Sequence, residues 1–282
     1  MRSKPCNRLL VCTITLISCC SATHTWAGAT LDGSDVSNGL TNSYFGTGND
    51  FTIPDTVGTT SGTNLFHSFS DFNIDTGESA TFSGPSSINN VITRVTGSAP
   101  STFNGSLTAL IDFSAPGGPA QTGANFFFIN PNGVIFKEGA NLNIGGAFTA
   151  TTSDFVKLGD DGIYYADLNA TSTLTSSPPS SFGFLDSNPG KISFEGTQLV
   201  KFINLNPATP KFSFIGGDIS LDEAPVGTAT NFGTDTSRGT FLTGNRVELV
   251  SVGSAGEALA TNGAYDLSSF TALGSVDILN GS

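Results

Sequence analysis

Residues 125–148, which read NFFFINPNGVIFKEGANLNIGGAF, constrain the fold of this chain more than any other segment. They contain three short runs in which apolar side chains alternate with other residues, the period of two expected for a β-strand with one buried face. The apolar positions of the three runs are Phe126 and Phe128, Val134 and Phe136, and Leu142 and Ile144. The segment therefore predicts three short strands within about two dozen residues.

A tight turn is expected between the first two runs, at Asn130-Pro131-Asn132-Gly133. Asn tolerates the left-handed region, Gly adopts positive φ freely, and Pro131 fixes its own φ while it pushes Asn130 into an extended conformation. Gly145-Gly146 closes the third run. Three strands with sharp corners predict one coil of a β-solenoid, in which each coil buries its apolar row on the next. A β-hairpin in a sandwich fits the same pattern equally well, so both interpretations stay open at this point.

Residues 1–27 have the pattern of a secretory signal peptide. Three basic residues precede an apolar run at residues 9–20, and Thr25 and Ala27 place small residues at positions −3 and −1 of a cut before Gly28. The apolar run is too short to cross a bilayer as a permanent helix. We therefore expect export by the general secretion machinery and a mature protein that begins at Gly28.

All four cysteines of the chain, Cys6, Cys12, Cys19 and Cys20, lie in this leader. A second interpretation of the leader follows from Leu16-Ile17-Ser18-Cys19, which resembles a bacterial lipoprotein signal in which Cys19 is acylated. Cleavage before Gly28 leaves a chain that forgoes disulfides in a compartment that allows them. A chain that must stay unfolded for a second translocation benefits from this absence, but a domain of this size also has enough core without disulfides.

The composition after the leader is acidic and rich in Phe. Removing residues 1–27 leaves 8 Lys and Arg against 23 Asp and Glu, a net charge of −15, which argues against binding nucleic acid or an anionic membrane surface through charge. Phe occurs 23 times against four Tyr and one Trp, and a ring without a polar group suits a dry stacked interior. Few helix formers and many turn residues predict an all-β protein. The roughly 255 residues after the leader are expected to form one domain.

Turn signals divide the rest of the chain into short segments. Residues 28–63 are polar with short apolar islands, and we expect them to cap the open end of a solenoid. Residues 64–74 (NLFHSFSDFNI) are densely apolar, and the Gly and Asn around them favour a bent strand over a turn of helix. Residues 159–181, which contain Pro178-Pro179, are expected to leave the coil as a loop or small hairpin.

Other strand-like runs recur along the chain, at residues 80–82, 91–95, 107–113, 191–194, 198–203, 211–215, 218–221, 246–250 and 275–279. Their irregular spacing of roughly 7–25 residues matches a parallel β-helix with corner loops of variable length better than the even rhythm of a sandwich. The alternation also predicts which side chains stack inward. They are Phe126, Phe128, Leu142, Ile144, Ile192, Phe194, Phe212, Phe214, Val247 and Leu249.

His67 is the single histidine after the leader. A Ser-His-Asp triad with Ser68 or Ser70 is formally possible, but the chain has no G-x-S-x-G nucleophile motif. Phenylalanines surround His67 in the sequence, so we expect a structural, hydrogen-bonded histidine. A zinc site built from Cys and His is excluded after cleavage, because only one such ligand remains.

Two adjacent pairs of carboxylates, Asp160-Asp161 and Asp222-Glu223, are the candidates for acid–base chemistry. Neighbouring side chains of a strand point to opposite faces, so neither pair forms a catalytic dyad by itself, and both are expected in solvated loops. No nucleotide-binding or EF-hand motif occurs in a fitting context. We therefore expect no catalytic site, no metal and no cofactor.

Six blocks of the sequence resemble, in the right order, the N-terminal secretion domain of the filamentous haemagglutinin family, the exported partners of bacterial two-partner secretion. The most specific block is FFFINPNGVIFKEGANLNIGGAFTATTSDF at residues 126–155, which contains the NPNG motif of that domain. The other blocks lie at residues 62–74, 88–97, 182–185, 214–221 and 245–257. Two features depart from the family: Lys137-Glu138-Gly139 replaces smaller turn residues, and the chain stops at Ser282 where members usually continue into a long repetitive adhesin region.

This resemblance implies a right-handed parallel β-helix with an N-terminal cap and extra-helical β elements. It implies that a cognate outer-membrane β-barrel transporter with periplasmic polypeptide-binding domains recognises the unfolded chain. The resemblance further implies that the chain crosses from the periplasm to the cell surface or the medium and folds there, with an adhesin-like role toward a host or cell-surface ligand and no enzymatic activity. The residues that the resemblance assigns to secretion are Asn130, Pro131, Asn132 and Gly133, together with Asn64, Leu65, Phe66, His67, Ser68 and Phe69.

Two other functions stay open on the sequence alone. One is a polysaccharide-active enzyme built on a β-helix, although no carboxylate dyad is visible. The other is a lipid-anchored surface binding protein that is held to the membrane through Cys19. The ordered blocks favour the exported protein, because the enzyme accounts only for the fold.

Overall fold

The computed structural model describes residues 28–40, 50–111, 123–196, 211–222, 246–262 and 264–279. These residues form an all-β protein with two short 3₁₀ helices, η1 (Asp35–Ser37) and η2 (Asp55–Val57), and no α-helix. No helix within this part of the chain is long and apolar enough to cross a membrane. The expected leader, its cut before Gly28 and the strand-like run at residues 198–203 lie outside the described residues.

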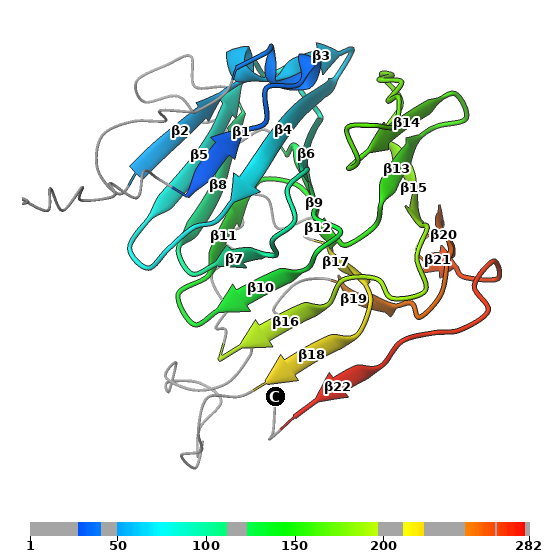
Figure 1. Cartoon of the computed structure of the whole chain (residues 1–282). Helices are drawn as coiled ribbons and strands as arrows, with labels where there is room; N and C mark the ends of the chain where they lie inside the picture. The colour runs from blue at the N-terminus through cyan, green and yellow to red at the C-terminus, as the bar shows by residue number, and fades with distance from the viewer. Residues whose placement is uncertain are drawn as a thin grey trace, which may run out of the picture.

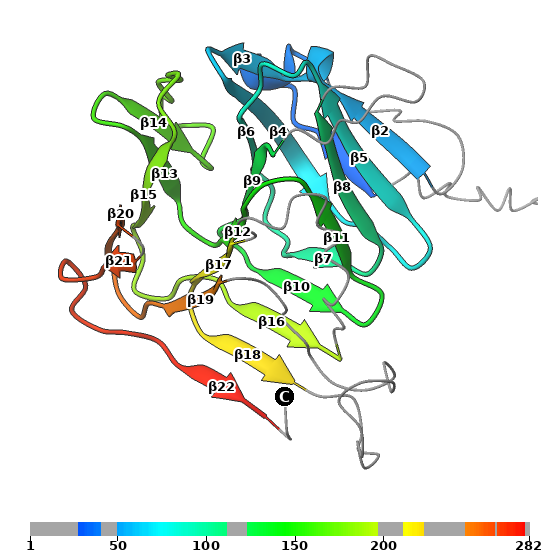
Figure 2. The same ribbon diagram turned by 180° about the vertical axis from the view of Figure 1, so that it is seen from behind.

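Most strands belong to three sheets with mainly parallel pairing, and the successive strands of each sheet follow chain order, from the blue end of the colour scale toward the red in Figures 1 and 2. The first sheet contains β1 (Ala29–Leu31), β3 (Thr59–Ser61), β4 (Asn64–Phe72), β6 (Asn90–Val95), β9 (Asn125–Ile129), β12 (Phe148–Thr151), β17 (Lys211–Gly216) and β19 (Arg246–Ser251). The second contains β7 (Ser101–Phe103), β10 (Val134–Lys137), β16 (Ile192–Glu195), β18 (Ile219–Asp222) and β22 (Val276–Ile278). The third contains β2 (Asp50–Pro54), β5 (Ser79–Gly84), β8 (Ser106–Ile111) and β11 (Asn141–Ile144).

The chain visits these three sheets in rotation. From β6 in the first sheet it passes to β7 in the second and β8 in the third, and it returns to the first sheet at β9, which pairs parallel to β6. The next round runs through β10 and β11 to β12, which pairs parallel to β9. This arrangement is consistent with a β-solenoid.

Residues 125–148 form one such round, because β9, β10 and β11 each lie in a different sheet. The hairpin alternative is wrong. β9 pairs with β6 and β12, whereas β10 pairs with β7 and β16, so the two strands that flank the 130–133 turn do not pair with each other. The turn is therefore a corner between two sheets.

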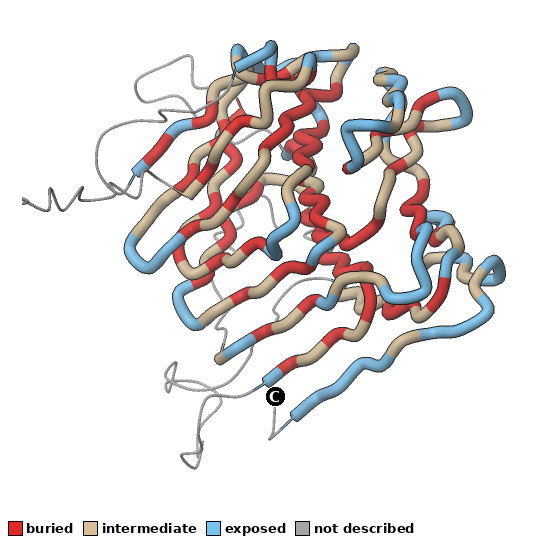
Figure 3. Tube along the Cα trace, in the orientation of Figure 1, coloured by how far each residue is buried: buried red, intermediate tan, exposed pale blue. Residues whose placement is uncertain are grey.

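The space between the three sheets is filled with stacked phenylalanines. Phe136 of β10 lies between Phe103 and Phe194, its register partners on β7 and β16, with ring centroids 5.2 and 5.1 Å away. Burial alternates along the strands in Figure 3, as one inward face requires. Eight of the ten side chains predicted to stack inward are buried, and the other two, Val247 and Leu249, are partly buried against the same core.

A fourth sheet is antiparallel and packs on the outer face of the first. It contains β13 (Phe155–Leu158), β14 (Gly162–Tyr165), β15 (Pro179–Phe184), β20 (Gly256–Thr261) and β21 (Ala264–Asp266). A second apolar cluster joins the two sheets, with Phe66, Ile92, Ile129 and Ile215 on one side and Val156, Leu158, Tyr164, Phe182 and Ala258 on the other. The predicted excursion at residues 159–181 holds β14 and the start of β15.

The predicted strand-like runs within the described residues are confirmed, as β5, β6, β8, β16, β17, β18, β19 and β22. The predicted bent strand at residues 64–74 is confirmed too, because β4 runs in the first sheet to Phe72 and Ile74 then bridges to Phe103 of the second. Within residues 28–63, β1 and β3 pair antiparallel to β4, whereas β2 pairs parallel to β5.

Candidate functional site

The corner between β9 and β10 is organised by the side chain of Asn130, which is fully buried. Its Nδ2 donates hydrogen bonds to the carbonyl oxygen of Ala99 and to Oγ of Ser101, both at 3.0 Å, and its Oδ1 accepts one from the backbone N–H of Asn132 at 3.0 Å. The amide thus closes its own turn and ties the corner to the preceding coil. Each polar atom of this buried side chain has a partner, as burial demands.

Gly133 completes the corner at a φ of 124°, in the region that favours glycine. Its backbone N–H donates to the carbonyl oxygen of Asn130 at 3.1 Å, which closes the turn. Its carbonyl oxygen accepts from the N–H of Ser101 in the preceding coil, and the next residue, Val134, donates to the carbonyl oxygen of Lys191 in the following coil. The corner is therefore clamped between its two neighbours in the stack.

Only part of the predicted motif is visible on the folded surface. Pro131 is half-buried and Asn132 is exposed, while Asn130 and Gly133 are buried. Nδ2 of Asn132 donates to the carbonyl oxygen of Gly97 at 2.7 Å, so even this exposed side chain is held to the preceding coil.

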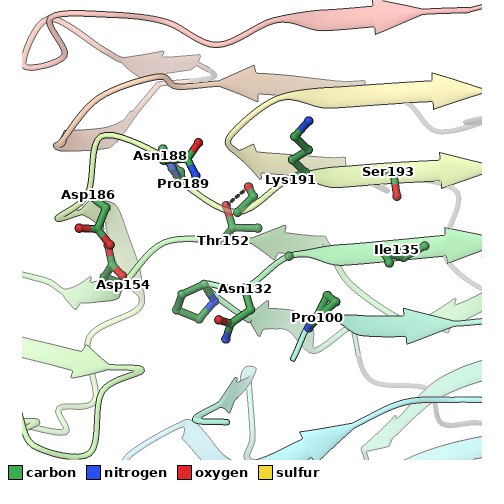
Figure 4. Close-up of a pocket in the computed structure, with 13 residues that line it drawn as sticks. Pro100, Asn132, Ile135, Thr152, Asp154, Asp186, Asn188, Pro189, Lys191 and Ser193 are labelled. Carbon is green, nitrogen blue, oxygen red and sulfur yellow. Dashed lines mark hydrogen bonds between the residues drawn. The ribbon is translucent and has the colours of Figure 1, made fainter. Parts of the chain in front are cut away.

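A cleft of about 700 Å³ lies between this corner and the loop at residues 186–191 (Figure 4). Thr152 lines this cleft, and its Oγ1 donates a hydrogen bond to the carbonyl oxygen of Gly190 at 2.8 Å. Asp154 and Asp186 lie at one end of the cleft. Burial and the charge of Asp186 raise the pKa of Asp154, and a hydrogen bond from the N–H of Leu185 partly opposes them. This hydrogen bond gives Asp154 a structural role, because it holds the residue that follows β15 to the segment that joins β12 to β13.

The second predicted segment, Asn64-Leu65-Phe66-His67-Ser68-Phe69, is part of β4, and all six side chains are buried. They divide between the two faces of the first sheet. Leu65 and Phe69 belong to the core inside the three sheets, whereas Phe66 faces the fourth sheet and packs edge-on against Tyr164 with centroids 5.1 Å apart. This division follows from the period of two.

Asn64 begins a ladder of asparagines that the sequence analysis missed. Its Oδ1 accepts from Nδ2 of Asn90 at 2.8 Å, and Oδ1 of Asn90 accepts from Nδ2 of Asn125 at 2.9 Å. Nδ2 of Asn64 also donates to the carbonyl oxygens of Thr175 and Ser177, which ties β4 to the excursion at residues 159–181. The available signal was an asparagine at the start of three successive first-sheet strands.

Ser68 lies on the opposite face of β4 from His67 and belongs to a buried polar network. Nε of Arg94 donates to Oγ of Ser68 at 2.6 Å, and this hydroxyl donates to the carboxylate of Asp32. The guanidinium also lies over the ring of Tyr164, 4.6 Å from its centroid. Burial alone raises the pKa of Asp32, but hydrogen bonds from Ser68 and Ser34 and the charge of Arg94 hold that pKa below its usual value. No Ser-His-Asp triad is formed here.

His67 is fully buried on the inner face of β4, where its ring packs against Phe82 and Phe69 with centroids 5.2 and 6.2 Å away. The predicted structural setting is confirmed. The predicted hydrogen bond is wrong, since neither ring nitrogen has a partner in the part of the chain that the structure describes. The physical reason is the face on which the ring lies: apolar rings surround it, and burial lowers its pKa to about 3.

The two predicted segments do not merge into one surface. Both lie along the first sheet, but β6 separates β4 from β9, and the 130–133 corner follows the far end of β9. Asp160 and Asp161 occupy an exposed turn between β13 and β14, as expected, and Glu223 lies outside the described residues. Among the described residues no group of three or more His, Cys, Asp or Glu side chains is placed to hold a metal ion.

Comparison with known families decides what kind of protein has this arrangement. One family model, described as TPS secretion domain, matches residues 27–279. The chain belongs to the TPS secretion domain family. No curated protein matches the chain.

Membership makes this chain an exoprotein of two-partner secretion, as the six blocks predicted. A TPS secretion domain implies a cognate outer-membrane transporter as partner and a route across the outer membrane to the cell exterior. The family is one of secreted exoproteins and is not known as an enzyme family. The match spans both predicted segments, residues 64–69 and 130–133.

Proposed function

We propose that the cognate transporter recognises this TPS secretion domain before it folds, through residues 64–69 and 130–133. We further propose that the chain is delivered to the periplasm by a signal peptide cleaved before Gly28. At the cell exterior it folds into a right-handed parallel β-helix, with residues 28–63 as its cap and the fourth sheet as an extra-helical element.

The observation that carries this proposal is burial. All six side chains of residues 64–69 and the amide of Asn130 are inside the folded protein. A transporter can contact them only while the chain is open. If these residues are the recognised ones, recognition precedes folding.

An unfolded chain can bind the transporter in the way that an extended peptide binds the edge of a β-sheet. Unpaired backbone groups of residues 64–69 can add a strand to a receptor, and alternate side chains supply specificity. Pro131 restricts the 130–133 segment even without the rest of the fold, so this segment keeps a local shape in an otherwise flexible chain.

Folding outside the cell supplies a direction to export. Each coil buries its Phe rings only when it stacks on the previous one, as Phe103, Phe136 and Phe194 do. A chain that emerges in order can therefore close coil by coil, and each closure opposes its return. The absence of cysteine after Cys20 keeps the chain free of cross-links during passage.

The adhesin-like role belongs to the folded state. Its support is the family resemblance, in which the exported domain acts at the cell surface or in the medium. A host or cell-surface ligand would meet the exposed parts of the coil, such as the cleft beside Asn132.

The test separates recognition from stability. Asn130→Ala and Pro131→Ala are compared with Ser101→Ala, which removes one hydrogen-bond partner of the Asn130 amide but leaves the motif intact. Two core variants, Ile192→Val and Phe128→Leu, extend the range of stabilities. Secreted yield is plotted against the urea midpoint of each purified variant.

Recognition predicts that Asn130→Ala and Pro131→Ala are secreted far less than control variants of equal stability. If all five variants fall on a single line of yield against stability, the corner acts only in folding and the export role is withdrawn.

A further inference from the structure

The imidazole of His67 lies in the core, where none of the described neighbouring groups would stabilise a positive charge on the ring. Phe82 and Phe69 pack against its ring, and Gly58 is so close that a Cβ at this position would lie 2.8 Å from Nδ1. The next strand places Thr93 in register with His67, and the Thr93 hydroxyl is also buried without a partner among the described residues. The inner face of the first sheet thus contains, among the described residues, two unsatisfied polar side chains on neighbouring strands.

The charged groups on the surrounding elements do not compensate an imidazolium. β5, which supplies Phe82, contains no charged residue, and the charged residue of β6, Arg94, is bonded to Ser68 on the other face of the sheet. Asp32 belongs to that same outer network. Asp55 of η2 lies toward Gly84 and Leu65, where an added Cβ at Gly84 would be 3.5 Å from the Asp55 Cβ.

We propose that His67 makes closure of the first coil sensitive to protons: the coil closes over a neutral imidazole, and acidification shifts the equilibrium of residues 64–69 toward the open state. Burying a charged group without a partner is strongly unfavourable, so a proton on His67 must leave before β4 packs against β5. This inference concerns folding, and it holds whether or not a transporter recognises the 130–133 corner.

The sign follows from the two pKa values. Burial lowers the pKa of His67 to about 3 in the folded protein, against about 6.5 in an open chain. Between these values the unfolded state binds one proton more than the folded state, so stability increases with pH across this window and the effect saturates above it. The folding equilibrium constant is expected to fall about tenfold on going from about pH 7.5 to about pH 5.5 through this group alone.

The test compares the wild-type protein with His67→Leu and His67→Gln, which remove the titrating group in an apolar and a polar form. Urea unfolding is followed by far-UV circular dichroism at about pH 7.5 and pH 5.5. All other ionisable groups are common to the three proteins, so the difference isolates His67. The wild-type equilibrium constant should fall about tenfold more than that of either variant. Thr93→Val should keep the wild-type pH dependence.

A second measurement needs only the wild-type protein. The Cε1–H NMR signal of His67 should keep its neutral position in the folded protein down to about pH 4.5. Equal pH dependence in the wild type and the His67 variants overturns the proposal. So does an imidazole that titrates near 6.5 in the folded state, or a Thr93→Val variant that has lost the pH dependence.

Discussion

Replacing Phe128 by Ala tests the stacked core at its centre. The ring is fully buried and packs against Phe103 and Phe72, with centroids 4.9 and 5.3 Å away. Truncating a buried Phe removes its transfer free energy and leaves a cavity, a loss of about 3–5 kcal/mol. The neighbouring coils limit collapse around the cavity, because their backbones are fixed by parallel pairing on both sides of β9. We therefore expect about 4–5 kcal/mol, the upper part of this range.

The assay is urea unfolding of the purified protein. With an m value of about 3 kcal/mol/M, the midpoint should fall by about 1.5 M. Phe127→Ala is the matched control, since Phe127 precedes Phe128 on the same strand and is partly buried on the outer face. A loss below about 2 kcal/mol for Phe128→Ala, or a loss no larger than that of Phe127→Ala, would refute the assignment of the inner face.

Three further changes test the corner and its surroundings. Gly190→Ala should destabilise the protein by about 1–3 kcal/mol, because the new Cβ would overlap the carbonyl oxygen of Pro131. A thermal midpoint unchanged from wild type would show that Gly190 and Pro131 are not packed this closely. Arg94→Met should cost about 1–3 kcal/mol, because it removes the donor to Oγ of Ser68 and the positive charge that helps to lower the pKa of the half-buried Asp32. Ser172→Ala removes the 3.4 Å bond of the same guanidinium and the acceptor for the N–H of Tyr165 but keeps the bond to Ser68, so it should cost less in the same urea titration. Burial and Asp186 raise the pKa of Asp154, so its contribution to stability decreases as pH rises through that pKa. As the pH rises from acidic to neutral, the stability of Asp154→Asn should therefore increase relative to that of the wild type. A decrease relative to the wild type over the same interval would contradict the raised pKa.

The sequence predicted the coil at residues 125–148 because alternation and turn chemistry agreed there. β12 was missed because its four residues, FTAT, contribute only Phe148 and Ala150 to the apolar core, a run too short and too weakly apolar to mark a strand, although all four residues are buried. The fourth sheet could not be predicted either, because β15 pairs with β20 across 76 residues, with Phe182 opposite Ala258, and no local pattern marks such a pairing.

The sequence predicted the two segments of the candidate site, residues 64–69 and 130–133, but it did not predict which side chains surround them. Asn64, Asn90 and Asn125 are 26 and 35 residues apart, so loop lengths rather than a fixed repeat bring them into register. The ring nitrogens of His67 lack hydrogen-bond partners because the ring lies on the inner face of β4. That face is set by the parallel register of β4 with β6, which contains no bulge and is a property of the whole fold.

Recognition before folding is tested most directly by the affinity of the transporter's periplasmic domains for two forms of this chain. One form is the folded wild-type protein, and the other is a variant kept open by Phe128→Ala together with Phe136→Ala, two losses inside the same core. The account predicts that the open form binds at least about tenfold more tightly, a difference of about 1.4 kcal/mol, and that Asn130→Ala and Pro131→Ala in the open form weaken this binding. Equal or tighter binding of the folded protein would contradict it.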